Sequence, residues 1–332
     1  MDVYDISSSI EMSAVAMASR MPPAVPPVIS WDTSRLLSQL HLRGIRSSQI
    51  QCDHHRNVKR PQGLAREVVS MQLENKRIVV AGGSRGIGAA TVRIYVREGA
   101  RVVFCGTNDA RGAQTEEEAN AQEGVSGHAT YLHCDVSDRA QVDAFIDKAV
   151  ELLGGLDVLA NVAGIESNSA AVDYADEQID RLMNINFKGT VYTNQAAYRV
   201  FKRNGTEGSI INYSSDTALV GMPNGAVYAA SKSAVLGWSR SIAIEWGQEA
   251  NVRTNCVHPT IQTEMYKQWL ETADPQIVAY HKEKLKSSYP IDGAMGDADR
   301  DCAPVMVFLA SDASRYVNGQ IICVNGGAYM VR

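Results

Sequence analysis

The sequence lacks long apolar runs, paired cysteines and an excess of basic residues. No run of apolar residues approaches the roughly 18–20 that a membrane-spanning helix needs, which excludes helical membrane proteins and predicts a soluble protein. The six cysteines are scattered, with no CxxC pair and no Cys/His spacing suited to zinc. We therefore expect no metal site, and free thiols in a reducing compartment such as the cytoplasm. The net charge of −5 argues against a nucleic-acid partner.

Residues 1–70 also lack sustained periodicity. They contain serine runs and a proline-rich stretch at 21–27, which predicts an extension that is disordered or loosely attached. Acidic residues near the start (Asp2, Asp5, Glu11) argue against an organelle transit peptide. Met71 opens a segment that reads like a natural protein start, so an over-extended N-terminus and a real extension of unknown role both stay open. One domain is expected at 71–332.

From Met71 onward, short apolar runs alternate with helical segments. The clearest helices are expected at 140–153, 176–203 and 226–247. Strands separated by helices imply right-handed crossovers and a parallel sheet covered on both faces. The sequence therefore predicts an α/β fold with a doubly wound, Rossmann-like, seven-stranded parallel sheet. The predicted strands are Arg77–Ala81, Arg101–Cys105, Thr130–His133, Leu156–Asn161, Ser209–Tyr213, Val252–Val257 and Gln320–Val324.

A glycine-rich turn joins the first predicted strand to the helix that follows. Such a turn lets the backbone approach a pyrophosphate at the positive end of the helix. The spacing is GxxxGxG rather than the general GxGxxG, and a glycine-rich turn can also be purely structural. Its place in the first strand-to-helix turn favours dinucleotide binding. The contacts expected from it are Gly82, Ser84, Arg85, Gly86, Ile87 and Gly88.

The end of the second strand indicates which dinucleotide binds. An acid there would hold the ribose 2′-hydroxyl of NAD, whereas a nearby arginine would suit the 2′-phosphate of NADP. No acid occurs before Asp109, Arg85 is well placed to meet a phosphate, and Thr107 could donate a hydrogen bond. We therefore favour NADP. Asp135, after the third strand, could contact the adenine or cap the next helix, and both alternatives stay open.

Tyr228 and Lys232 are four residues apart in a predicted helix and would share one face. A neighbouring cation favours the phenolate, so we expect Lys232 to lower the pKa of Tyr228 toward a useful range. The spacing alone also occurs in ordinary amphipathic helices. The surrounding motifs must decide.

Together these motifs resemble the short-chain dehydrogenase/reductase family over essentially all of residues 71–332. Their order and spacing match the family, and Ser215 lies thirteen residues before Tyr228, as the family shows. The resemblance implies the seven-stranded fold, a nicotinamide cofactor and a hydride-transfer site at the carboxyl ends of the strands. The matching motifs are Gly82-x3-Gly86-x-Gly88, Asn161-Val162-Ala163-Gly164, Asn186, Ser215, Tyr228-x3-Lys232, Val257-His258-Pro259-Thr260 and Val324-Asn325-Gly326-Gly327.

By this resemblance four residues are catalytic. Tyr228 would transfer the proton, while Lys232 would keep the phenol acidic and bind the nicotinamide ribose. Ser215 would stabilise charge on the substrate oxygen. Asn186, with Asn184 as a nearby competitor, would position Lys232 and a proton-relaying water. Further cofactor contacts are implied at Asn161, Ala163, Gly164, Pro259, Ile261 and Thr263.

The chain departs from the family pattern at three positions. Val162 stands where the family has a second Asn, Thr260 where it has Gly, and Asn325 where it has Asp. None of the three removes a catalytic group. The turn over the nicotinamide must, however, tolerate the β-branched Thr260.

The substrate is less readable than the cofactor. The loop at about 261–295 holds Met265, Tyr266, Trp269, Tyr280 and Tyr289, which could line an aromatic pocket or pack a lid helix onto the core. Glu166 and Asp216 could face the pocket or be solvent-facing loop acids. Two carboxylates there would suit a polyhydroxylated or amine-bearing substrate and disfavour an anionic thioester.

We expect an NADP-dependent oxidoreductase that interconverts a ketone and a secondary alcohol on a small molecule. The alternatives are a catalytically silent dinucleotide-binding module, an NAD-linked alcohol dehydrogenase of the same fold, and an epimerase or dehydratase. The intact Ser215, Tyr228 and Lys232 argue against the silent module. By resemblance, helices 176–203 and 226–247 pack between subunits and imply a homodimer or homotetramer.

Overall fold

The computed structural model of the protein describes residues 71–262 and 264–330. These residues form a parallel sheet in the order β3-β2-β1-β4-β5-β6-β7, which confirms the predicted seven-stranded fold. The limits differ slightly from the prediction, since β3 begins two residues earlier and β4 two residues later. The strands are β1 (Arg77–Ala81), β2 (Arg101–Gly106), β3 (His128–His133), β4 (Val158–Asn161), β5 (Gly208–Tyr213), β6 (Val252–Pro259) and β7 (Ile321–Val324).

The strand order reverses direction between β1 and β4, which pair with each other in parallel. In open α/β sheets, ligands bind in the crevice that such a reversal leaves outside the carboxyl ends of the strands. The glycine-rich turn follows β1 and the segment 161–164 ends β4. The topology therefore brings both predicted cofactor motifs to one crevice.

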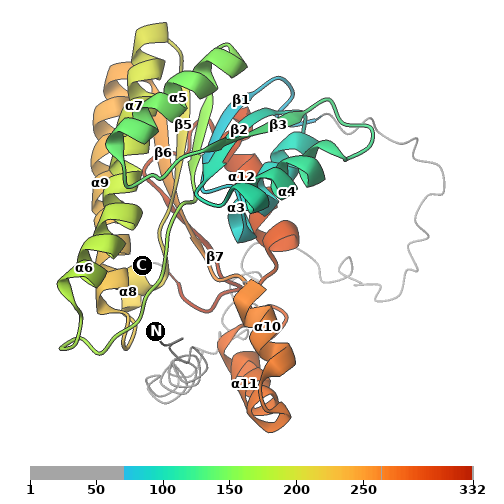
Figure 1. Cartoon of the computed structure of the whole chain (residues 1–332), viewed down its shortest axis with the longest axis vertical. Coiled ribbons are helices and arrows are strands. Elements are labelled where there is room, and N and C mark those ends of the chain that lie inside the picture. The colour runs from blue at the N-terminus through green and yellow to red at the C-terminus, as the bar shows by residue number, and fades with distance from the viewer. Residues whose placement is uncertain (1–70, 263, 331–332) are drawn as a thin grey trace, which may run out of the picture. The chain divides into compact units, whose positions relative to one another are not determined.

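Helices cover both faces of the sheet (Figure 1). One face carries α3 (Gly86–Arg97), α4 (Asp109–Asn120) and α12 (Ala303–Ala310), and the other carries α5 (Arg139–Leu153), α7 (Gly189–Asn204) and α9 (Ala226–Ala250). At the carboxyl ends of the strands lie α6 (Asp176–Leu182), α8 (Thr217–Val220), α10 (Glu264–Thr272) and α11 (Pro275–Ser288). None of the helices in the described part of the chain is long and apolar enough to cross a membrane.

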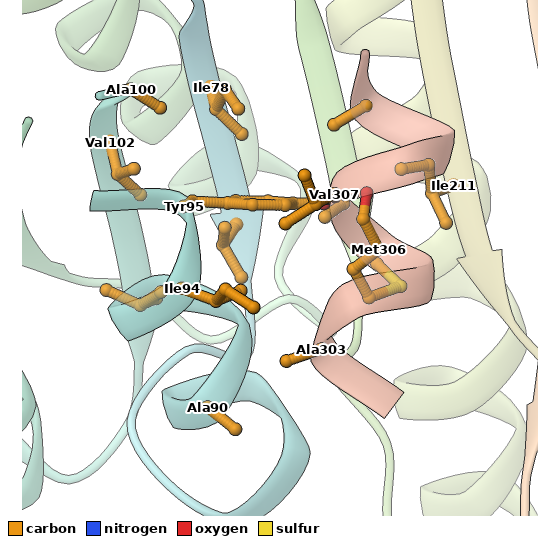
Figure 2. Packing of buried hydrophobic residues seen from close by; sticks show 14 of the residues in the cluster. Ile78, Ala90, Ile94, Tyr95, Ala100, Val102, Ile211, Ala303, Met306 and Val307 are labelled. Carbon is orange, nitrogen blue, oxygen red and sulfur yellow. Dashed lines mark hydrogen bonds between the residues drawn. The ribbon is translucent and has the colours of Figure 1, made fainter. Parts of the chain in front are cut away.

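The core is a packed layer on each face of the sheet. Strand residues are apolar on both faces, as buried parallel strands must be, and Ile78 through Ala81 are wholly buried. On one face the ring of Tyr95 from α3 lies between Ile78 of β1 and Val307 of α12 (Figure 2). Its hydroxyl donates to the carbonyl of Met306 at 3.3 Å. Each such large side chain contributes about 1.5–3 kcal/mol by leaving water.

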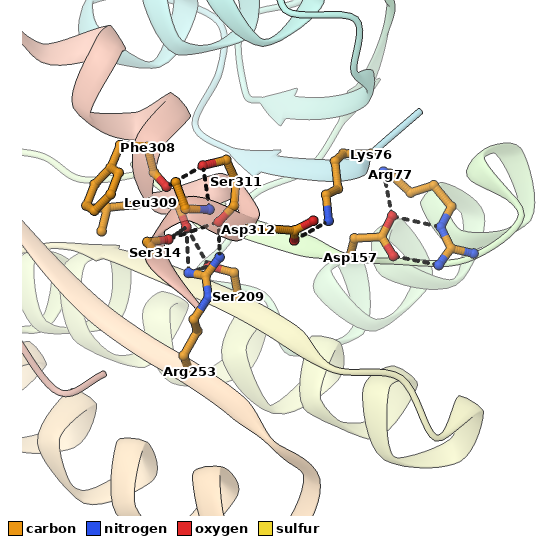
Figure 3. A network of polar contacts seen from close by, with 11 residues as sticks. Lys76, Arg77, Asp157, Ser209, Arg253, Phe308, Leu309, Ser311, Asp312 and Ser314 are labelled. Carbon is orange, nitrogen blue, oxygen red and sulfur yellow. Dashed lines mark hydrogen bonds and ion pairs between the residues drawn. The ribbon is translucent and has the colours of Figure 1, made fainter. Parts of the chain in front are cut away.

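Charged side chains at the amino ends of the strands have hydrogen-bond partners (Figure 3). Arg77 donates to Asp157 through Nη2 at 2.6 Å and Nε at 3.0 Å, and its backbone N–H adds a third bond at 2.8 Å. Arg253 of β6 donates to the Ser209 hydroxyl and to the carbonyl oxygens of Leu309 and Ser311. These bonds tie β1 to β4 and the start of β6 to the end of α12.

Candidate active site

The turn after β1 leaves no room for side chains at two of its glycines. A Cβ on Gly82, where φ is +85°, would lie 2.5 Å from the backbone nitrogen of Ala163. A Cβ on Gly88 would lie 1.9 Å from the Gly82 carbonyl oxygen. At Gly86, where φ is +53°, no atom of the described residues lies within 4 Å of an added Cβ. The turn is therefore closely packed beneath and open at the amino end of α3, which fits a pyrophosphate.

Of the other residues of the turn, two pack against the protein and one is exposed and could contact a ligand. Ser84 packs over Gly106, where an added Cβ would lie 2.4 Å from the serine hydroxyl. Ile87 packs against the core, so only its backbone can face a ligand. Arg85 is exposed, directly precedes α3, and has no ion pair or side-chain hydrogen bond within the described residues. It is the available cation at the mouth of the turn.

The acid nearest the end of β2 is already engaged. Asp109 accepts a hydrogen bond from Tyr131 Oη at 2.9 Å, and its Oδ1 lies 2.7 Å from His133 Nδ1. Bonds from His133 and then Tyr131 lower the pKa of Asp109. Thr107 is exposed just beyond the strand. Its hydroxyl, rather than a free carboxylate, is therefore available at this end.

Asp135 does not cap a helix. Its Oδ1 accepts from the backbone N–H of Ser137 at 2.9 Å and from the Ser137 hydroxyl at 2.7 Å. The side chain that caps α5 is Asp138, which accepts from two N–H groups of the first turn. The capping alternative for Asp135 is therefore wrong, and its contact with adenine stays a prediction.

Asn161, the last residue of β4, is buried with an unsatisfied side chain. It is 2% exposed, and neither its Oδ1 nor its Nδ2 has a hydrogen-bond partner within the described residues. Leaving such a group unpaired costs about 1–3 kcal/mol. Together with the bare glycine turn beside it, this amide fits the predicted adenosine contact, so the residues present can accommodate a dinucleotide.

Tyr228 and Lys232 share one face of α9, as their spacing predicts. The ammonium of Lys232 lies 5.9 Å from the centroid of the Tyr228 ring and donates to the Tyr213 carbonyl oxygen at 3.1 Å. Lys232 is 4% exposed, and burial lowers its pKa to about 8. Gly164 must be bare for this lysine to fit, since a Cβ there would lie 3.0 Å from Nζ.

The pKa of Tyr228 shifts in the direction opposite to the expected one. Burial, followed by the charge of Glu166, raises it to about 12, and a hydrogen bond with Ser215 offsets only part of the rise. The expectation that Lys232 lowers this pKa is therefore wrong for this arrangement. The ammonium donates to the Tyr213 carbonyl rather than to the phenol, and desolvation of the phenolate is the largest cause of the shift. Tyr228 is consequently protonated at neutral pH and can act as a proton donor.

Ser215 lies two residues beyond the end of β5. Its hydroxyl oxygen accepts from the Thr217 hydroxyl at 3.0 Å and from the Thr217 backbone N–H at 3.2 Å. The turn that begins α8 therefore fixes the position of the oxygen. With these two donors on its oxygen, the serine proton is free to be directed toward Tyr228 or a substrate.

Asn186 lies in a π-helical turn, Met183–Lys188, which interrupts the predicted helix 176–203 between α6 and α7. It is fully buried; its Nδ2 donates to the Ile165 carbonyl at 2.9 Å and to the Ser231 hydroxyl at 3.0 Å, while its Oδ1 accepts from the Ile165 N–H at 2.8 Å. The amide thus ties the loop after β4 to α9, one residue before Lys232. Wide turns of this kind are frequent at functional sites.

The competitor Asn184 lies elsewhere, lining a surface pocket with Asp135 and Arg181. Asn186 is therefore the residue beside the lysine. The sequence reasoning missed its partners Ile165 and Ser231. A serine directly before the lysine of Tyr228-x3-Lys232 was the available signal.

The segment after β6 supports the crevice mainly through its backbone. Pro259 ends β6, and the Thr260 N–H donates to the Val324 carbonyl at 2.9 Å. Ile261 is 8% exposed and packs in the core, so its side chain does not line the site as a cofactor contact would. The predicted contact Thr263 lies outside the described residues.

Two departures from the family pattern meet at Asp216. Oδ2 of this aspartate accepts from the Thr260 hydroxyl at 2.9 Å and from Asn325 Nδ2 at 3.0 Å. Asp216 is 5% exposed, so its interpretation as a solvent-facing loop acid is wrong. Glu166, in contrast, is exposed, and its negative charge raises the pKa of both Tyr228 and Lys232.

The aromatic residues beyond β6 pack α10 against α11. Trp269 is 7% exposed, and its ring meets His281 edge-on at 5.0 Å. Tyr266 Oη lies 3.1 Å from His281 Nε2. Tyr280 instead is 57% exposed. The packing alternative accounts for Trp269 and Tyr266, which hold the two helices together beyond the carboxyl ends of the strands (Figure 1).

Comparison with known proteins gives relatives over the same region. Residues 81–329 match the enoyl-(acyl carrier protein) reductase family. A 3alpha-hydroxysteroid dehydrogenase of Mediterraneibacter gnavus is 36% identical over 262 residues, covering 78% of this chain and 98% of its own length. The 3-oxoacyl-[acyl-carrier-protein] reductase FabG of Thermotoga maritima is 35% identical, covering 77% and 99%. The L-rhamnose 1-dehydrogenase (NAD(P)(+)) of Azotobacter vinelandii is 37% identical, covering 78% and 99%.

A solved structure agrees with these sequences. A short-chain alcohol dehydrogenase from Sinorhizobium meliloti superimposes with a TM-score of 0.70 at 32% identity, covering 78% of this chain and 98% of its own. The match therefore extends over the whole sheet and the crevice that holds the Tyr228–Lys232 pair. On the agreement of motif order, sheet topology and these relatives, the chain belongs to the short-chain dehydrogenase/reductase family.

Proposed function

We propose that the protein is an NADP-dependent oxidoreductase that interconverts a ketone and a secondary alcohol on a small molecule. The observation that carries this proposal is the grouping of the Tyr228 hydroxyl, the Ser215 hydroxyl and the buried Lys232 ammonium beside the glycine-rich turn. The names of its relatives, which are steroid and sugar dehydrogenases and an oxoacyl reductase, support the same pair of functional groups, a ketone and an alcohol.

A bound nicotinamide would supply or accept the hydride. In the direction of reduction, Tyr228 donates its proton to the substrate oxygen, because burial keeps the phenol protonated. Ser215 donates a hydrogen bond to the same oxygen as negative charge develops on it. Lys232 places a positive charge beneath the phenol, and Asn186 positions α9 through Ser231.

We assign NADP rather than NAD to the crevice on three grounds. Arg85 is exposed and unpaired within the described residues, Thr107 offers a hydroxyl, and the Asp109 carboxylate is engaged by Tyr131 and His133. An unpaired arginine suits a 2′-phosphate, while an engaged carboxylate is a poor acceptor for a ribose hydroxyl.

The substrate side carries a negative charge. Glu166 is exposed at the carboxyl end of β4, and its charge raises the pKa of both Tyr228 and Lys232. A carboxylate there favours a polyhydroxylated or amine-bearing substrate over an anionic thioester. We also propose a cytoplasmic homodimer or homotetramer that packs through α7 and α9, where Ile244 is 65% exposed. Light scattering of the purified protein measures that assembly.

The cofactor assignment is tested by titrating the purified protein with NADPH and NADH. The unmutated protein should bind NADPH more tightly. Arg85→Ala should weaken NADPH by roughly 10- to 100-fold, as expected for lost bonds to a charged group, and leave NADH unchanged. Arg97→Ala, at the far end of α3, is the matched control. Equal affinities before and after Arg85→Ala would refute the assignment.

The reaction is tested by NADPH consumption with ketones, quinones, sugars and 3-oxoacyl thioesters. Turnover of one of the carbonyl compounds supports the proposal, and the product alcohol identifies the substrate class. Tight NADPH binding without turnover of any class would instead favour a silent dinucleotide-binding module.

A further inference from the structure

Three potential metal ligands meet where β5, β6 and β7 end. His258 of β6 and Cys323 of β7 are register partners in neighbouring parallel strands, so their side chains lie on the same face. Asp216 follows the end of β5, the strand on the other side of β6. Ligand atoms of the three side chains lie within 4.8 Å of one another, and His258 Nδ1 is 3.8 Å from Asp216 Oδ1.

The cluster is buried and its polar atoms are unsatisfied. His258 is 0% exposed, and neither ring nitrogen has a hydrogen-bond partner within the described residues. Asp216 Oδ1 is likewise buried without a partner. A separation of 3.8 Å is too long for a hydrogen bond. The imidazole and the carboxylate oxygen thus face each other without forming a hydrogen bond. Each unsatisfied buried group lowers the stability of the fold by about 1–3 kcal/mol.

We propose that Asp216, His258 and Cys323 bind one zinc-class divalent cation. A neutral imidazole, a carboxylate and a thiolate form a set of ligand types that zinc uses in proteins. The carboxylate and the thiolate each carry one negative charge, and together they neutralise the two positive charges of the ion in the buried site. With bonds of about 2.0–2.3 Å, tetrahedral ligand atoms lie about 3.3–3.6 Å apart, so ligand atoms as far apart as 4.8 Å must approach each other by about 1.2–1.5 Å.

The neighbours of Asp216 suit a metal-binding carboxylate. Metal-bound carboxylates usually accept further hydrogen bonds that fix their orientation. Here Thr260 and Asn325 both donate to Oδ2, which leaves Oδ1 as the single oxygen that faces His258. An aspartate at 325 would instead set a second buried carboxylate against Asp216. The two departures from the family pattern therefore stabilise this acid.

The site has an entry path and a consequence for the reaction. Cys323 is only partly buried, and β7 is the last strand at its edge of the sheet, so an ion can reach the thiolate first. Asp216 directly follows Ser215, so a bound ion restrains the segment that carries the serine. Sequence spacing predicted no metal site because these three residues are far apart in the chain and only the sheet brings them together.

The test uses full-length protein purified without chelators. Elemental analysis should find about one zinc per chain, and replacement by Co²⁺ should give the charge-transfer absorption of a cobalt–thiolate bond. Cys323→Ser should abolish that absorption, whereas Cys134→Ser, at a buried cysteine outside the cluster, should retain it. Asn325→Ala should keep the absorption but weaken zinc affinity by about 10- to 100-fold.

Two results would overturn the proposal, and neither depends on enzymatic activity. One is the absence of stoichiometric zinc or cobalt binding by the unmutated, folded protein, which would leave the cluster a buried polar contact. The other is an unchanged cobalt spectrum in Cys323→Ser. If Cys323→Ser does not fold by circular dichroism, His258→Gln and the unmutated protein's own cobalt spectrum decide the question.

Discussion

Polar side chains at the two ends of the sheet differ in whether they have hydrogen-bond partners. At the amino ends, Arg77 and Asp157 form a two-pronged ion pair, and Arg253 donates to one hydroxyl and two carbonyl oxygens (Figure 3). The unpartnered buried atoms found near this end are the hydroxyls of Thr206 and Thr254. These charged side chains thus have hydrogen-bond partners where the structure has only to hold itself together, although burial lowers the pKa of Arg253 to about 10.

At the carboxyl ends several buried polar atoms lack hydrogen-bond partners. The amide of Asn161, one oxygen of Asp216 and both ring nitrogens of His258 have no partner within the described residues. The buried ammonium of Lys232 has one carbonyl. Proteins keep such costly groups where a ligand or a reaction uses them. The difference between the two ends therefore locates function independently of any motif.

The comparison predicts its largest effect at Tyr228. Tyr228→Phe should lower kcat by about 100- to 10,000-fold, since the proton donor is lost, while NADPH affinity stays within about twofold. Steady-state kinetics and a fluorescence titration measure the two quantities. Tyr198→Phe is the control and should keep full turnover, because this half-buried tyrosine of α7 stacks on Trp246 and its hydroxyl donates to Glu249. A fully active Tyr228→Phe would contradict the proposed mechanism.

At the same end, removing the buried charge should stabilise the fold. Burial lowers the pKa of Lys232 from its unfolded value of about 10.4 to about 8, so the unfolded chain binds more protons between these values. Burying the Lys232 ammonium therefore destabilises the fold fully below about pH 8, and this destabilisation disappears as the pH rises toward about 10. Lys232→Met should therefore raise the free energy of unfolding at pH 7 by about 1–3 kcal/mol, less near pH 10, while abolishing turnover.

Denaturant unfolding at pH 7 and pH 10 measures this difference. Lys202→Met, at an exposed lysine of α7, should change stability by less than about 0.5 kcal/mol at both values. A Lys232→Met variant that is less stable at pH 7 than the unmutated protein would show that the ammonium is compensated after all.

At the amino ends of the strands, removing a charged side chain should instead destabilise the fold, and by a smaller amount. Burial raises the pKa of Asp157, but hydrogen bonds from Arg77 lower it more, and the net shift is downward. The pair therefore stabilises the fold at neutral pH and loses its contribution as the pH falls through the folded pKa, below about 3.9. Asp157→Asn should cost about 1–2 kcal/mol at pH 7, with turnover unchanged.

The measurement is again denaturant unfolding, now at pH 7 and at several pH values below about 3.9. The difference between Asp157→Asn and the unmutated protein should narrow as the pH falls, because protonation removes the same charge. A constant difference would mean that the effect comes from shape rather than from the ion pair.

Local patterns predicted the individual strands, the glycine-rich turn and the shared helix face of Tyr228 and Lys232 correctly, because each depends on residues close together in the chain. The contacts of Asn186 with Ile165 and Ser231 could not be predicted in this way, since they depend on how a loop and two helices pack. The direction of the Tyr228 pKa shift failed for a related reason: spacing places a cation nearby but does not reveal how deeply the phenol is buried.

The meeting of Asp216, Thr260 and Asn325 is the clearest limit of sequence reasoning here. The substitutions at 260 and 325 were visible as two unrelated departures from the family pattern. Strand register and the loop after β5 bring them onto one carboxylate. A fold had to be known before they could be read as a single feature.

The π-helical turn at Met183–Lys188 also sets the phase of the long helical segment. One extra residue in an α-helix rotates everything beyond it by about 100°. The rotation of α7 about its axis is thus independent of that of α6. The apolar side of α7 can therefore face the sheet while α6 turns a different set of residues toward the crevice. Deleting a single residue from this turn would restore a regular helix and turn the Asn186 amide away from α9. One residue of helical phase therefore decides whether the two halves of the site are joined.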